Sequence, residues 1–164
     1  MKKSILYVMV VSTITITSCT NNTSEKAAVT RIEATGQTNT ASFTVDGTSY
    51  KGKVSTQYFG SNTETDNFSV LCQQDDPLVL LQATFANEKD AANSELKPKG
   101  FDGYKVNAGQ FDLSLTPAGS TENFVATDKT TGTIKVEHKK IVISNIKLFN
   151  REGQEKLVNG TIEF

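Results

Sequence analysis

The chain of 164 residues is poor in the residue types on which many catalytic and metal sites depend. It contains no Trp, two Cys and one His, which is His138. Nucleophilic catalysis would have to use that one imidazole as its base, and the usual Cys and His spacings of zinc sites are absent. A Gly-x-Ser-x-Gly stretch, typical of hydrolases, is also missing. We therefore predict no enzyme and no catalytic, cofactor-binding or metal-ligating residue.

An excess of basic residues is lacking too. Lys and Arg number 17 against 18 Asp and Glu, and the basic residues form no long block. Proteins that bind nucleic acid or anionic lipid through charge alone carry a basic patch that is visible in such counts. The composition therefore predicts no nucleic-acid partner.

The chain also lacks an apolar run long enough to span a bilayer, which needs roughly 20 apolar residues. The longest run is Ile5–Val11, preceded by Lys2 and Lys3 and followed by small polar residues. A charged start, a short apolar core and small residues before a cleavage site are typical of a secretory signal peptide. This favours a signal peptide at residues 1–18 over the alternative, a membrane-spanning anchor.

The residues Ile16, Thr17, Ser18 and Cys19 resemble the lipobox of bacterial lipoproteins, which has an aliphatic residue, two small residues and a Cys. The resemblance implies cleavage after Ser18 and a diacylglyceryl group on Cys19, usually with a further acyl chain such as palmitate on the new amino group. More than one acyl chain is needed for stable anchoring. We expect Cys19 to hold the protein on a lipid bilayer of the cell envelope. The expected place is the outer membrane, on its periplasmic or surface face.

The polar composition of residues 19–40 indicates a lipidated Cys followed by a tether, because such a segment buries little apolar surface. A tether of roughly 21 residues would span about 25 Å. Within it, residues 26–33 fit either a turn of helix or an edge strand through Val29 and Ile32, and the sequence leaves both open.

The remaining cysteine, Cys72, has no partner for a disulfide if Cys19 is lipidated. It shares its phase with Phe68 and Val70 in an alternating segment. A lone Cys in such surroundings is typical of a small core residue rather than a nucleophile.

Residues 41–164 form one domain with the alternating pattern of β-strands. The clearest hairpin has Ala41–Val45 as its first strand, Asp46-Gly47 as a two-residue turn and Tyr50–Tyr58 as its return strand. The segment Leu78–Phe85 is apolar on both faces, which predicts a strand in the middle of a sheet. Further strands are predicted at 68–72, 104–106, 111–115, 124–126, 134–138, 141–149 and 158–164.

Three features of the second half carry specific expectations. Lys139-Lys140 is predicted as a turn, and Asn150–Gly153 closes the last hairpin, which we expect to be integral to the sheet. Asn159-Gly160 is interpreted as strand interior with a bulge. Nine or ten short strands predict a single antiparallel β-sandwich, with a calycin-like β-barrel as the alternative.

A core follows from the common phase of these strands. Its predicted members are Phe43, Val70, Cys72, Leu81, Phe85, Leu113, Ile134, Val136, Ile146, Ile162 and Phe164.

Residues 87–100 break the alternating pattern. Asp90–Leu96 is predicted as a short helix that Pro98 and Gly100 end. Long loops on β scaffolds are either binding loops or simple connections, and both interpretations stay open here.

A second resemblance rests on Phe43–Tyr50, Gly103-Tyr104, Gly132–Val136 with Ile143-Ser144, and Asn159–Phe164. These segments look like the small β-rich lipoproteins of unknown function that are common in Bacteroidota, over most of residues 41–164. The chain departs from that family at Asn145-Ile146-Lys147, where a Gly-Thr-Phe pattern is usual. The resemblance implies an envelope location and supplies no catalytic residues.

Weaker candidates for binding chemistry are the acidic pair Asp75-Asp76 and the aromatic groups Tyr58-Phe59 and Phe101 with Tyr104. The acidic pair lacks the alternating spacing of a calcium loop, and the aromatics would have to replace Trp as a platform for sugars. The favoured function is a non-enzymatic module that binds an envelope protein partner or assists an envelope assembly. The alternatives are a calycin-like barrel for a small apolar ligand, which would need an open interior, and an enzyme.

Replacing Cys19 with Ala should release the protein from the membrane fraction and leave the domain folded, because the acyl chains supply the attachment. Fractionation after a carbonate wash and a thermal melt of the released protein measure the two effects. The matched variant Cys72→Ala should stay with the membrane. Retention of Cys19→Ala after the wash would contradict the assignment.

Overall fold

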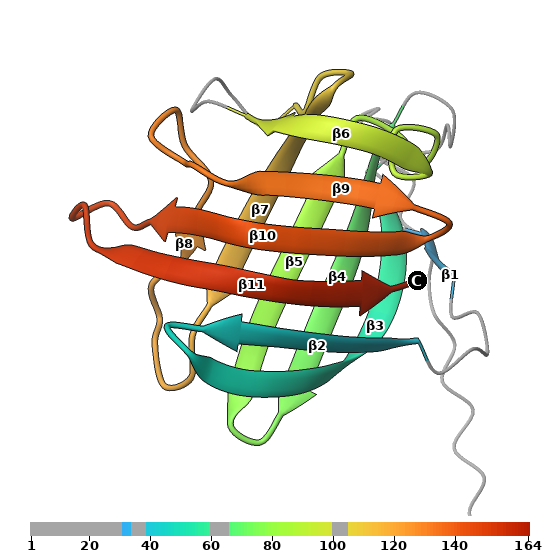
Figure 1. The fold of residues 1–164 in the computed structure, drawn as a ribbon. Helices are drawn as coiled ribbons and strands as arrows, with labels where there is room; N and C mark the ends of the chain where they lie inside the picture. The colour runs from blue at the N-terminus through green and yellow to red at the C-terminus, as the bar shows by residue number, and fades with distance from the viewer. Residues whose placement is uncertain (1–30, 34–38, 60–65, 100–104) are drawn as a thin grey trace, which may run out of the picture.

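A computed structural model describes residues 31–33, 39–59, 66–99 and 105–164, and every regular element in them is a strand (Figure 1). The predicted all-β class is therefore confirmed. The strands are β1 Arg31–Glu33, β2 Thr40–Val45, β3 Thr48–Phe59, β4 Asn67–Asp75, β5 Leu78–Phe85, β6 Asn93–Pro98, β7 Gln110–Thr116, β8 Phe124–Val125, β9 Thr133–Glu137, β10 Lys140–Phe149 and β11 Glu155–Glu163.

The sheet closes into a nine-stranded barrel rather than forming a sandwich, so the alternative architecture is the one observed. Neighbouring strands follow the order β3-β2-β11-β10-β9-β6-β7-β5-β4, and β4 returns to β3. Closure depends on β3, because Thr48–Lys53 pairs with β2 whereas Lys53–Phe59 pairs with β4. In Figure 1, β2, β11, β10, β9 and β6 cross the front and β4, β5 and β7 run steeply behind them.

The strand order differs from the up-and-down order of calycin barrels. Strand β6 lies between β9 and β7, antiparallel to the first and parallel to the second. The last strand, β11, pairs with both β10 and β2. The C-terminal hairpin is therefore integral to the sheet, as predicted.

The helix predicted at Asp90–Leu96 is wrong, because β6 occupies most of that segment. Residues Asn93–Leu96 pair with β9, and Leu96 is buried in the core. The preceding turn is fixed by Asp90, whose Oδ2 accepts a hydrogen bond from Gly109 N at 3.0 Å. Pairing and burial across the barrel outweigh a local helical preference, which no sequence window can show.

The turn between β9 and β10 lies one residue earlier than predicted. Glu137 pairs with Lys140, so the turn residues are His138 and Lys139, with φ of 50° and 61°. This register sets apolar residues opposite one another, Ile141 against Val136 and Ile143 against Ile134. A turn at Lys139-Lys140 would have paired His138 with Ile141 and Asn145 with Ile134, which places polar side chains in the core.

The Asp46-Gly47 turn is confirmed, since Val45 pairs with Thr48 and both turn residues have positive φ. The last hairpin loop is one residue longer than predicted, because Phe149 pairs with Glu155.

Gly160 lies inside β11, as predicted, and the bulge lies opposite it in β10. The register of β10 shifts between Ile143 and Ile146, and Asn145 has a φ of 51°. Asn159 accommodates the bulge, because its Oδ1 accepts a hydrogen bond from Asn145 N at 2.7 Å. A Cβ at Gly160 would lie 2.5 Å from Phe43 Cβ, so the residue must be glycine for β11 to approach β2.

The predicted core is confirmed for every member except Phe164, which is half-buried. The other ten side chains are at most 2 % exposed. Phe164 packs on Phe68 with ring centroids 5.8 Å apart. Its backbone N also donates to Lys139 O at 3.0 Å, which fixes the C-terminal residue to the β9–β10 turn.

Within the predicted tether, Arg31–Glu33 forms the edge-strand alternative. This strand, β1, pairs with Thr56–Tyr58 of β3. Strand β1 pairs with the same edge of β3 as β2 does, but farther along β3. Because β2 pairs only as far as Lys53, that edge is open to β1 at Thr56–Tyr58. Cys19, the predicted lipidation site, and the predicted signal peptide lie outside the described residues.

Substituting Gly160 with Ala should lower the free energy of unfolding by about 1–3 kcal/mol, because the new methyl group overlaps the Phe43 backbone and Cβ. Urea unfolding measures the change. The neighbouring substitution Thr161→Ala, at an outward position of the same strand, should change stability by less than about 0.5 kcal/mol. Equal urea midpoints for Gly160→Ala and Thr161→Ala would show that β11 does not approach Phe43 of β2 this closely.

Candidate functional site

The residues singled out in the sequence do not converge on one site. Cys72 is fully buried inside the barrel, and burial raises the pKa of its thiol to about 12, which confirms a core role. His138 is exposed in the β9–β10 turn. Asp75 ends β4 and is exposed, where Gln73 and Lys53 bind its carboxylate and hold its pKa below the usual range.

The remaining candidates are equally separate. Phe101 and Tyr104 lie outside the described residues. Tyr58 is buried and donates a hydrogen bond to Glu88, whereas Phe59 is exposed. Among the described residues, no three His, Cys, Asp or Glu side chains gather closely enough to hold a metal ion.

Large side chains fill the inward positions of the barrel. Phe43, Phe68, Phe85 and Phe111 are each at most 2 % exposed, and they pack with Leu and Ile side chains from β5, β7, β10 and β11. The inward positions are where a calycin-like barrel would hold a ligand. A partner would therefore contact the outer surface of the barrel.

One half of the outer surface, formed by β9, β10, β11 and the β2–β3 turn, carries paired charges, and we name it the charged face. Lys140 pairs with Glu163 at 3.4 Å, Lys147 with Glu155 at 3.0 Å and Lys156 with Asp46 at 2.7 Å. The partners of each pair come from adjacent strands or turns. These exposed pairs keep this half of the barrel hydrated.

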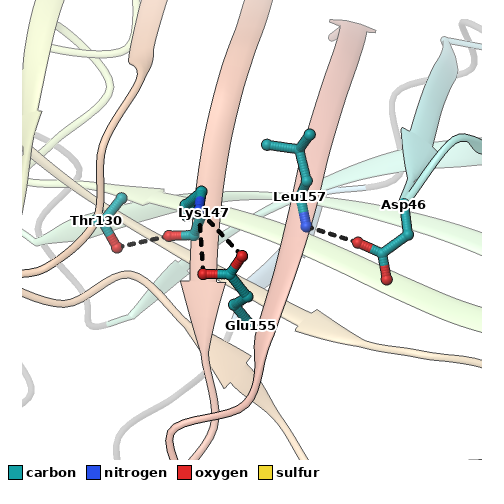
Figure 2. A network of polar contacts seen from close by, with 5 residues as sticks. All are labelled: Asp46, Thr130, Lys147, Glu155 and Leu157. Atoms are coloured by element: carbon teal, nitrogen blue, oxygen red, sulfur yellow. Dashed lines mark hydrogen bonds and ion pairs between the residues drawn. The ribbon is translucent and has the colours of Figure 1, made fainter.

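The charged face also fastens loops to the barrel, as Figure 2 shows. Asp46 Oδ1 accepts a hydrogen bond from Leu157 N at 2.9 Å, which ties the β2–β3 turn to β11. Partial burial raises the pKa of Asp46, but hydrogen bonds from Lys156 and Leu157 N outweigh it and hold the pKa below 3.8. Thr130 Oγ1 donates to Lys147 O at 2.8 Å and holds the loop before β9.

The opposite half of the outer surface, formed by β3, β4, β5 and β7, has a different composition, and we name it the neutral face. Its residues lie in two rows across the four strands. The rows are Ser55, Leu71, Gln82 and Ser114, and Gln57, Ser69, Thr84 and Asp112. In β4, β5 and β7 these side chains alternate with buried core residues, and seven of the eight are uncharged. Beyond the two rows, toward the β4–β5 turn, the face carries the exposed ion pair of Lys53 with Asp75 at 3.1 Å.

The centre of the neutral face is a small hydrogen-bonded cluster. Ser69 Oγ and Thr84 Oγ1 lie 2.6 Å apart, and Gln82 Nε2 donates to both, at 3.2 Å and 3.3 Å. Ser69 is fully buried although it points outward. The hydroxyl pair therefore contacts an amide, and these hydrogen bonds hold the three side chains in place on the surface.

Apolar side chains border this cluster. Leu71 and Leu80 are half-buried, and Leu78 at one end of the face is 52 % exposed. Phe59 at the other end is 46 % exposed. Cores of protein interfaces are depleted in charged residues and enriched in aromatic ones, so the neutral face has the composition of such a surface.

Asp112 is the acidic residue of the two rows. Burial raises the pKa of its carboxyl above the usual 3.8, and nearby Lys99 and the Leu113 N–H oppose part of that rise. Lys99 is itself buried and follows β6. The charge at this edge of the face is therefore partly desolvated and lies beside an opposite charge.

Sequence reasoning missed the neutral face, apart from noting that β5 is apolar on both sides. Ser69, Thr84 and Asp112 belong to no motif and come from three strands. Only the register of β4, β5 and β7 places them in one row. The alternation did predict that each of them points away from the core.

Comparison with protein-family models, with curated proteins and with solved structures found no match to this chain. Within the described part of the chain, no helix is long and apolar enough to cross a membrane.

Replacing Asp112 with Asn should raise the melting temperature at neutral pH. A raised folded-state pKa means that the folded protein binds the proton more tightly, so the contribution of Asp112 to stability falls as pH rises through that pKa. The advantage of the variant should therefore shrink toward zero below pH 3.8, where the wild-type carboxyl is protonated in both states.

Thermal melts across that pH range measure the effect. Asp75→Asn is the matched control, because the pKa of Asp75 is shifted in the opposite direction and the side chain is exposed. The control should leave the melting temperature unchanged or lower it at neutral pH. A lower neutral-pH melting temperature for Asp112→Asn would contradict the prediction.

Proposed function

We propose that this chain is an envelope lipoprotein, anchored through acyl chains on Cys19, whose barrel is a non-enzymatic module that binds a protein partner. The partner contacts the neutral face. The observation that carries the proposal is the contrast between this face and the charged face of the same barrel.

Desolvation decides which face suits a partner. Covering the charged face would remove water from the pairs of Lys140, Lys147 and Lys156, and desolvation of ion pairs commonly costs as much as the pairing returns. Covering the two central rows of the neutral face leaves the Lys53–Asp75 pair at its edge. It removes water from Ser69, Thr84 and Gln82, whose hydrogen bonds are already made within the face. Its leucines gain from the same burial.

Rigidity supports the same choice. The neutral face lies on four strands that pair continuously over most of their length, and β4, β5 and β7 carry fully buried side chains on their inner side. Its outward side chains are thus already held in place before a partner arrives. A preorganised surface loses little conformational entropy on binding.

The lipid anchor gives the module its place of action. The signal peptide at residues 1–18 and the lipobox Ile16–Cys19 direct the chain to the envelope, and acyl chains keep the barrel beside a membrane. A partner in the same envelope then meets the barrel at a raised local concentration. This is the setting of a protein that assists an envelope assembly.

Affinity capture from detergent-solubilised envelope with the tagged full-length protein tests the proposal. Gln82→Lys places an unpaired charge in the centre of the neutral face, and it should reduce the captured partner about tenfold or more. The matched variant Thr161→Lys adds the same charge to an outward position of β11 and should leave capture unchanged.

Circular dichroism and melting of both variants exclude a folding defect. If Gln82→Lys captured as much partner as the wild type and Thr161→Lys captured none, the partner would bind the charged face instead. Absence of any specific protein captured by the wild type would contradict a partner-binding role.

A further inference from the structure

We propose that one end of the barrel, which carries Asn39, the β9–β10 turn and Phe164, faces the bilayer and contacts anionic lipid headgroups. We name it the proximal end. The inference rests on the proposed lipid anchor at Cys19 and adds the orientation of the barrel and a second membrane contact.

The first step is where the chain that leads from Cys19 meets the barrel. It does so at β1, which pairs with Thr56–Tyr58, and again at Asn39, whose carbonyl accepts a hydrogen bond from Val54 N. In Figure 1, β1, the C-terminus and the β9–β10 turn lie on the same side of the barrel, and the β10–β11 loop lies on the opposite side.

The second step is reach. Cys19 and Arg31 are twelve residues apart, and a chain of that length has an average span of about 20 Å, at about 5–6 Å times the square root of its length. Strand β10 has ten residues and is therefore about 33 Å long. A barrel attached through β1 thus keeps the proximal end near the bilayer, whereas the β10–β11 loop lies a strand length farther away.

The third step is the chemistry of the proximal end. A surface hollow there is lined by Asn39, Lys135, Glu137, His138, Lys139, Lys140, Val142, Glu163 and Phe164. Glu163 pairs with Lys140, and Lys135 lies beside Glu95 of β6. The lining thus holds three lysines against two glutamates, and Lys139 is exposed at the apex of the turn.

The opposite end has the reverse balance. Its hollow is lined by Thr121, Glu122, Asn123, Val125, Phe149, Asn150, Arg151 and Glu152, with two carboxylates to one guanidinium. Glu122 accepts a hydrogen bond from Asn150 Nδ2 at 2.6 Å, which holds this loop in shape. Anionic headgroups attract the proximal end and repel the distal end, so charge and tether favour the same orientation.

The β9–β10 turn projects its side chains away from the barrel, toward the proposed membrane surface. His138 and Lys139 close a two-residue hairpin beyond the last strand pair, Glu137 and Lys140. Lysine side chains reach past their backbone and place the ammonium among headgroups while the stem lies along apolar surface. The half-buried Phe164 and the exposed Val142 supply apolar surface beside the turn.

Two variants of the full-length lipoprotein, each with one added cysteine, test the orientation. Glu137→Cys marks the proximal end and Glu152→Cys marks the distal loop; each removes one exposed carboxylate, and Cys72 is too deeply buried to react. Each protein, labelled with a fluorophore, is placed in vesicles of equal parts phosphatidylcholine and phosphatidylglycerol that contain nitroxide-headgroup lipid. The label at residue 137 should be quenched several times more strongly than the label at residue 152.

Charge reversal isolates the lipid contact. Lys139→Glu should reduce the quenching at residue 137 by at least about fivefold in anionic vesicles, because loss of one lysine from such a surface has about that effect and the new carboxylate adds repulsion. The matched variant Arg151→Glu should leave it unchanged, and pure phosphatidylcholine should abolish the difference between the two.

The outcomes separate the two proposals. Equal quenching at both positions, or stronger quenching at residue 152, overturns the orientation while the anchor stands. Failure of the unlabelled wild-type protein to associate with either vesicle overturns the anchor and the orientation together.

Discussion

The fold depends on a single long strand that pairs with two different neighbours. Strand β3 lies against β2 along its first half and against β4 along its second half. This change of partner turns a mostly antiparallel sheet back on itself, so that the inward side chains of the barrel strands meet in one core. At the middle of β3, Lys53 pairs with β2 on one edge and with β4 on the other. The closed sheet therefore lacks the long open edge that a flat sheet would expose.

Close approach of backbones completes the closure. Gly160 leaves room for Phe43, and the bulge at Asn145 lets β10 follow the bend of β11. A second glycine, Gly132, lies against the bulge, where a Cβ would be 2.3 Å from Asn145 O. These contacts join β2, β10 and β11, so strands from the two ends of the domain sequence stabilise each other.

A filled barrel directs function to its outside. With four phenylalanines inside, the chain has two outer faces of different chemistry and two ends of different charge. The neutral face suits a protein surface because little charge must be desolvated there. The proximal end suits a membrane because the chain that leads to Cys19 joins it. The two proposals use different parts of the barrel and are compatible.

The sequence by itself determined the all-β class, ten of the eleven predicted core residues and the Asp46-Gly47 turn. Each of these follows from local alternation or from the φ preference of one dipeptide. It also predicted the roles of Cys72 and Gly160, because their phase in a strand was visible. The lipobox and signal peptide are likewise sequence features, and they remain predictions.

Only the tertiary structure decided the choice of a barrel over a sandwich, the strand at Asn93–Pro98 and the position of the β9–β10 turn. Each depends on which strands become neighbours, as when Leu96 reaches the core through pairing with β9. The neutral face has the same origin, since Ser69, Thr84 and Asp112 are far apart in the chain and meet through register alone. Alternation tells which side of a strand a residue occupies, but the identity of its neighbours is a property of the closed sheet.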